Sequence, residues 1–108
     1  MDFRELQERL KIFADDRDWK QFHSPKNLSM ALSVEAAELL EHFQWLTEEE
    51  SSSPDSVDRN EVATEIADIQ IYLAMIAGKL GVDIEKAVYE KIDSNAAKYP
   101  PNDVPQDK

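Results

Sequence analysis

The chain has 108 residues, which suits one domain and leaves no room for a second. Its 23 acidic and 12 basic residues give a formal net charge of −11, which disfavours nucleic acid as a partner, and no apolar run approaches the roughly 20 residues of a membrane span. The sequence has no cysteine, which excludes disulfides and thiolate metal sites. We therefore expect a cytoplasmic protein without nucleic-acid or membrane partners.

Four helices are predicted, because apolar residues recur at helical spacing and the five prolines lie between or after these segments. In chain order, we expect helices over residues 3 to 17 or 19, 27 or 28 to 46, 57–80 and 83–98. The polar segment 47–58 reads as a mobile linker. The predicted fold class is all-α: a bundle of four main helices in one domain over residues 1–98, followed by a flexible tail over 99–108.

The third predicted helix carries two apolar bands instead of one. One band contains Ile69, Leu73, Ile76 and Leu80, and the other contains Ile71 and Met75. A helix with two apolar bands is expected to be buried on two sides, and a chain this small cannot cover both by itself. We therefore expect a homo-oligomer, either a dimer or a tetramer, that completes the bundle.

Two pairs of acids occupy positions that solubility does not explain. Glu35 and Glu38 share one face of the second helix, where Glu35 interrupts an apolar stripe, and Glu65 and Asp68 repeat this spacing on the third helix. The alternative is that all four are ordinary solvated acids. The register is also open, because Glu38 and Glu41 have the same spacing.

Several carboxylates that converge in apolar surroundings are costly unless cations lie between them. The stretch from residue 62 to 78 contains no basic residue that could neutralise them. An all-oxygen ligand set favours Mg²⁺ or Mn²⁺ over Zn²⁺. The competing hypothesis from another class is a non-catalytic helical interaction protein whose acids are solvated.

Further sequence blocks follow one another around the four acids. They are Arg17-Asp18-Trp19, Phe22-His23-Ser24-Pro25-Lys26-Asn27, Phe43-Gln44-Trp45, Asp68-Ile69-Gln70-Ile71-Tyr72-Leu73, Lys91-Ile92-Asp93-Ser94-Asn95 and Tyr99-Pro100. Together with the acids, they resemble the MazG-like all-α nucleoside triphosphate pyrophosphohydrolases, and in particular the dCTP pyrophosphatase branch. One departure is Val34, which stands where many MazG relatives have a glutamate; that branch lacks the glutamate as well.

The resemblance implies an obligate oligomer that hydrolyses a nucleoside triphosphate between the α and β phosphates and so sanitises the nucleotide pool. It also implies that Glu35, Glu38, Glu65 and Asp68 bind Mg²⁺. Since the sequence shows no Cys nucleophile and no Ser-His-Asp arrangement, direct attack by water is preferred over a covalent intermediate. We assign the role of holding or deprotonating the attacking water to Glu38, although the sequence alone does not select among the acids.

The resemblance also indicates six substrate-binding residues: Trp19, His23, Trp45, Tyr72, Lys91 and Asn95. Each also has an ordinary structural interpretation, since tryptophans usually pack in cores and lysines usually lie at surfaces. Carboxylates and magnesium recognise only the triphosphate, so selectivity for a base requires aromatic stacking and polar groups at its edge. We expect dCTP as the substrate; dUTP or a phosphoribosyl nucleotide is the alternative.

Overall fold

The computed structural model describes residues 1–101, and within this range it contains helices and no strand. The four long helices are α1 (Phe3–Asp16), α2 (Pro25–Glu41), α4 (Arg59–Leu80) and α5 (Ile84–Lys98). The short elements between them are η1 (Lys20–Phe22), α3 (Glu48–Ser51) and η2 (Pro54–Ser56). The predicted all-α class is confirmed. No described helix combines the length and the apolar character that crossing a membrane requires.

The long helices begin at side chains that accept hydrogen bonds from free backbone N–H groups. Asp2, Ser24, Asp58 and Asp83 serve as N-caps. Helix α4 ends at Gly81, whose φ of 68° is a left-handed conformation that glycine adopts without steric cost. These signals explain why the third and fourth helices lie where the sequence predicts them.

Two predictions about the middle of the chain were wrong. Helix α2 begins at Pro25 instead of residue 27 or 28. Proline has no backbone N–H, but the N–H groups of the first helical turn have no partner within the helix, so proline is tolerated there. The helix ends at Glu41 instead of residue 46. After Glu41 the backbone forms a tight turn, in which the N–H groups of Phe43 and Gln44 both lie 2.9 Å from the carbonyl oxygen of Leu40. Apolar spacing alone does not distinguish such a turn from a further helical turn.

The predicted linker 47–58 instead contains two short helical elements. Helix α3 is stabilised by a capping box: the Thr47 hydroxyl accepts from the backbone N–H of Glu50, and the Glu50 carboxylate accepts from the N–H of Thr47. Of the predicted tail, residues 102–108 lie outside the described part of the chain.

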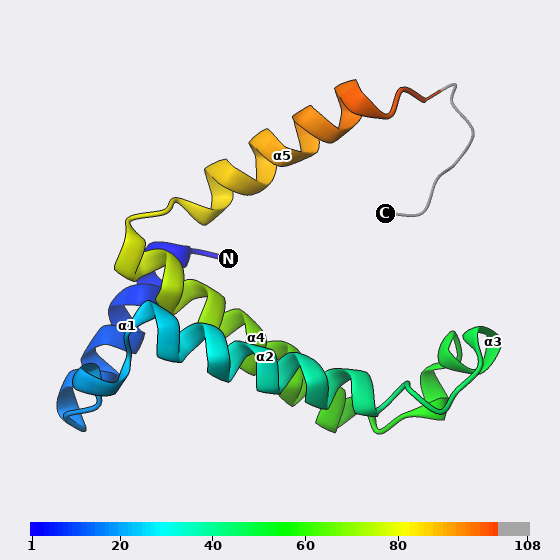
Figure 1. Ribbon diagram of the computed structural model, residues 1–108, viewed down its shortest axis with the longest axis horizontal. Coiled ribbons are helices and arrows are strands. Elements are labelled where there is room, and N and C mark those ends of the chain that lie inside the picture. Colours follow the sequence, from blue (N-terminus) through cyan, green and yellow to red (C-terminus); the bar gives the residue numbers. More distant parts are fainter. Residues whose placement is uncertain (102–108) are drawn as a thin grey trace.

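Helices α2 and α4 run antiparallel and side by side, and α1 packs against α4 near one end of this pair (Figure 1). Helix α5 instead projects away from the α2–α4 pair. Four of the described residues are buried: Ala14, Leu28, Ala74 and Ala77. All four come from α1, α2 and α4, so the core lies where these three helices meet, and it is small.

An apolar groove of about 650 Å³ runs between α4 and α5. It is lined by Phe3, Gln70, Leu73, Ile76, Ala77, Leu80, Val82, Ile84, Ala87, Val88, Lys91 and Ile92. Several of its large side chains are exposed, including Leu80 at 61% and Ile92 at 54%. One of the two apolar bands predicted for the third helix therefore faces this groove, and residues 1–101 of the same chain do not cover it.

Candidate active site

The acids of the paired motifs differ from their neighbours in burial. Glu35 and Glu38 on α2 are half-buried, whereas Glu41, the next acid at the same spacing, is exposed. On α4, Glu65 and Asp68 are also half-buried. Of the two registers that the sequence allows on α2, only the first therefore places both acids in the helix interface.

The four half-buried acids act on one another electrostatically. The pKa of Glu35 is raised above its ordinary value, first by desolvation and then by the hydrogen bond it shares with Glu38. The negative charges of Glu38, Asp68 and Glu65 raise it further. Because charges interact appreciably only over short distances in a protein, the antiparallel pair of helices brings both motifs to one place.

A histidine absent from the predicted site also belongs to this cluster. Nε2 of His42, the residue that follows α2, lies 2.6 Å from Oε2 of Glu65. The contact joins α2 to α4, and Oε2 is a buried carboxylate oxygen with no other polar contact among the described residues. The sequence held a signal for His42, because residues 35, 38 and 42 recur on one helical face.

The cluster suits a hard divalent cation in its chemistry. The donors are carboxylate oxygens, and the pKa of Glu35 is raised by desolvation, by the hydrogen bond with Glu38 and by the neighbouring negative charges, which a cation would neutralise. Within residues 1–101, no three His, Asp or Glu side chains already stand in a metal-ligand arrangement. The residues therefore fit Mg²⁺ by donor type and charge.

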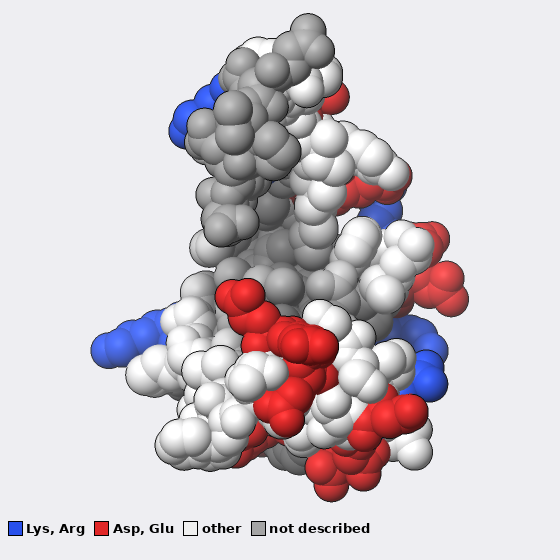
Figure 2. Space-filling model, turned by 90° about the vertical axis from the view of Figure 1, so that its right-hand side faces the viewer, with Lys and Arg blue, Asp and Glu red and all other residues white. Residues whose placement is uncertain are grey.

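The remaining acidity of the chain is of a different kind. Figure 2 shows acidic side chains gathered at the end of the molecule that carries α3. Helix α3 begins with Glu48, Glu49 and Glu50, and all three are exposed. These three are ordinary solvated acids, whereas the acids of the paired motifs on α2 and α4 are half-buried.

Trp19 and His23 lie together in the connection between α1 and α2. The turn after α1 passes through Asp18, whose φ of 55° is left-handed, a conformation that aspartate tolerates better than most residues. The Trp19 ring then packs edge-on against Phe13 and His23, with ring centres 5.6 Å and 6.5 Å apart. Trp19 remains 45% exposed, so part of its ring is open to a ligand.

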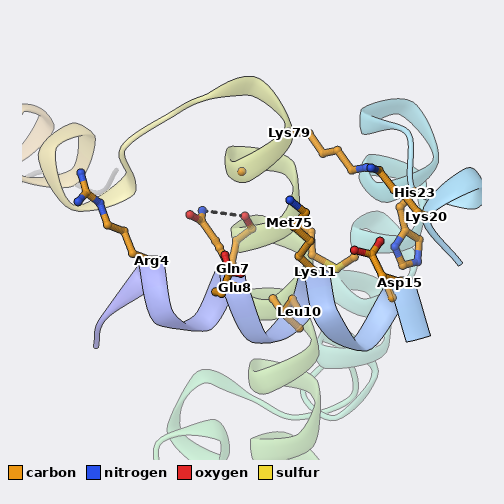
Figure 3. A pocket seen from close by; sticks show the side chains of 13 residues that line it. Arg4, Gln7, Glu8, Leu10, Lys11, Asp15, Lys20, His23, Met75 and Lys79 are labelled. Carbon is orange, nitrogen blue, oxygen red and sulfur yellow. Dashed lines mark hydrogen bonds between the residues drawn. The ribbon is translucent and has the colours of Figure 1, made fainter. Parts of the chain in front are cut away.

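Beside His23 lies a cavity of about 530 Å³ between α1, η1 and α4. Its basic lining residues are Arg4, Lys11, Lys20 and Lys79. Figure 3 shows Lys79 of α4 extending toward His23. The pKa of His23 is lowered by burial and, to a lesser extent, by the positive charge of Lys79, which favours the neutral imidazole. The sequence-based prediction did not include the lysines around this cavity.

One chain does not bring the six predicted substrate-binding residues together. Trp19 and His23 precede α2 and Trp45 follows it, so the 17 residues of the helix hold them roughly 25 Å apart. Trp45 is 87% exposed. Lys91 and Asn95 lie on the projecting helix α5, with Lys91 lining the apolar groove. Tyr72 is half-buried on α4, one turn beyond Asp68.

The fold and the paired acids define an all-α protein with a shared carboxylate site on two antiparallel helices. A model of the MazG-like family matches residues 30–105. The chain therefore belongs to the MazG-like family, which confirms the resemblance found in its motifs.

Individual relatives narrow this assignment. The chain is 44% identical to dCTP pyrophosphatase 1 of Bos taurus over 90 residues, covering 82% of this chain and 53% of that protein. It is 43% identical to dCTP pyrophosphatase 1 of Homo sapiens, also over 90 residues and with the same coverage. The chain thus spans about half the length of these relatives. The crystal structure of a pyrophosphatase from Archaeoglobus fulgidus matches with a TM-score of 0.81 and 40% identity, covering 90% of this chain and 91% of that one.

Proposed function

We propose that this protein is a Mg²⁺-dependent nucleoside triphosphate pyrophosphohydrolase that converts dCTP to dCMP and pyrophosphate. The observation that supports this most directly is the set of four half-buried carboxylates on α2 and α4, in which desolvation and the neighbouring acids together raise the pKa of Glu35. The names of the mammalian relatives and of the archaeal structure agree with it.

Glu35, Glu38, Glu65 and Asp68 are the residues that would hold Mg²⁺, or Mn²⁺ in its place. When bound, the metal supplies charge neutralisation for the phosphates and lowers the pKa of a water molecule. The chain itself contributes the positions of the acids, because the helices that carry them, α2 and α4, pack side by side. We assign to the carboxylate of Glu38 the role of accepting the proton of the attacking water.

The cavity beside His23 is a suitable place for the nucleotide's anionic and polar groups. Four basic side chains, among them Lys20 and Lys79, outnumber the two acids of its lining, Glu8 and Asp15, in a protein whose net charge of −11 otherwise repels a triphosphate. The open part of the Trp19 ring can stack on a base, and a neutral His23 can either donate or accept a hydrogen bond at the base edge. These features support a selective site for a nucleoside.

We further propose that the protein acts as a homo-oligomer, either a dimer or a tetramer. Only four of the described residues are buried, and the α4–α5 groove leaves large apolar side chains exposed. A second copy that covers the groove would bury these side chains. It would also bring Lys91, which lines the groove, to the interface between the two copies.

Rates of hydrolysis measured with Mg²⁺ over dCTP, dUTP, dTTP, dATP and dGTP test the proposal. We expect dCTP to be cleaved faster than the purine nucleotides, with pyrophosphate as a product. A faster rate with dATP or dGTP would refute the assignment of the base but not the assignment of the carboxylate site.

Because dCTP belongs to the cytoplasmic nucleotide pool, we propose the cytoplasm as the site of action and pool sanitation as the role.

A further inference from the structure

His42 lies at the next position of the face that carries the α2 acids. Glu35, Glu38 and His42 follow the spacing i, i+3 and i+7, and the backbone of His42 remains helical with φ −67° and ψ −22°. Because α4 runs antiparallel to α2, a residue at the end of α2 meets the first half of α4. His42 therefore faces Glu65, one of the four acids of the cluster.

The contact between His42 and Glu65 is short and largely shielded from solvent. The two side chains are 18% and 16% exposed, and Nε2 lies 2.6 Å from Oε2. His42 is a nitrogen base in contact with an otherwise all-carboxylate cluster, while Oε2 retains an unused hydrogen-bonding capacity. A buried carboxylate oxygen that accepts no hydrogen bond destabilises the fold unless a positive or polar group stays beside it.

We infer that His42 is a positioning residue that holds the Glu65 carboxylate at the α2–α4 interface, ready to bind the metal. This inference rests on the proposed function. Groups that contact a ligating carboxylate fix its orientation, and their removal typically weakens metal binding by 10–100-fold. Without His42, the Glu65 side chain would be free to rotate away from the negative charges of Glu35 and Asp68.

A purely structural contact that joins α2 to α4 is the alternative, and it makes a different prediction. A structural contact lowers the stability of the fold without changing the affinity for a metal. A positioning contact changes metal affinity in protein that is still folded, and a side chain that restores the donor also restores the affinity.

The test is calorimetric titration of Mn²⁺, without nucleotide, into wild-type protein, His42→Leu and His42→Gln. Leucine keeps much of the volume but has no donor, whereas the glutamine amide nitrogen reaches nearly as far as Nε2. We expect His42→Leu to raise the dissociation constant for Mn²⁺ at least about tenfold and His42→Gln to restore most of the affinity. If His42→Leu does not fold, His42→Asn replaces it, since its shorter amide falls short of Glu65.

Gln7→Leu is the matched control, because it removes another contact between helices, the 3.0 Å hydrogen bond from Gln7 Nε2 to the Ala74 carbonyl oxygen. It should lower stability and leave Mn²⁺ affinity unchanged. Equal Mn²⁺ affinity in wild type and His42→Leu would overturn the role of His42 and spare the proposed function. Wild-type protein that binds Mn²⁺ in a His42-dependent way but hydrolyses no nucleoside triphosphate would refute the function instead.

Discussion

The carboxylate cluster and the predicted base-binding residues lie in the same chain but are organised differently. The acids of α2 and α4 meet inside one chain, where two antiparallel helices hold them half-buried and electrostatically coupled. The aromatic residues lie apart, with Trp19 before α2 and Trp45 after it. The acids are therefore held by contacts within the described chain, whereas Trp19 and Trp45 are separated by the length of α2.

The largest effect on activity is expected from removing one acid of the carboxylate cluster. Glu38→Ala or Asp68→Ala should lower Mg²⁺-dependent dCTP hydrolysis by roughly 1000-fold or more, because several kcal/mol of metal-based stabilisation of the transition state are lost. Rates and circular dichroism should be measured together, since helicity should stay unchanged. Glu41→Ala is the matched control, as Glu41 is exposed on the same helix, and it should keep wild-type activity.

The second prediction concerns the α4–α5 groove. Ile92→Asp places a charge in the apolar surface that we assign to a second copy, which costs several kcal/mol and should weaken association by roughly 100-fold or more. Light scattering should detect a shift toward monomer. Ala97→Asp adds the same charge to an exposed position outside the groove lining and should not change the assembly. A wild-type monomer at micromolar concentration would contradict the prediction.

A smaller effect is expected at Trp45. If the exposed ring stacks on the base in the assembled protein, Trp45→Ala should raise KM for dCTP by roughly 5–150-fold, corresponding to 1–3 kcal/mol, with little change in kcat. Steady-state kinetics separate the two constants. Ile12→Ala, an exposed apolar residue on α1, serves as the control. An unchanged KM in Trp45→Ala would remove this residue from the binding site.

The smallest effect is on the stability of the metal-free protein. Because the pKa of Glu35 in the fold lies above its ordinary value of 4.5, ionised Glu35 destabilises the fold as pH rises above that value. Glu35→Gln should therefore be more stable than wild type at neutral pH and equally stable below about pH 4. Thermal melts across this range measure the difference. A stability difference between Glu35→Gln and wild type that does not change with pH would contradict ionisation of Glu35 as its cause.

Much of the fold could be predicted because its signals are local. The caps at Asp58 and Asp83 and the left-handed Gly81 fix the boundaries of α4 and α5 from a few neighbouring residues. The end of α2 was missed, because the residues after Glu41 keep the apolar spacing of a helix although their backbone turns. The direction of α5 could not be predicted from neighbouring residues either, since it depends on what covers the apolar face of this helix.

For the site, helical spacing pairs Glu35 with Glu38 and Glu65 with Asp68, since i, i+3 residues lie on one face by geometry alone, and all four side chains are half-buried. The partner of Glu65 was missed, because it depends on the axial register between α2 and α4, which spacing along one helix does not determine. The lysines around the cavity were missed for the same reason: Lys20 and Lys79 are 59 positions apart in the sequence.

Product analysis of dCTP hydrolysis tests the central claim most directly. Wild-type protein and Glu38→Ala are incubated with dCTP, with and without Mg²⁺, and the products are separated by ion-exchange chromatography. We predict dCMP and pyrophosphate in equal amounts from wild type with Mg²⁺, and neither product without Mg²⁺ or from Glu38→Ala. Primary release of dCDP and orthophosphate, or equal rates in wild type and Glu38→Ala, would contradict the account.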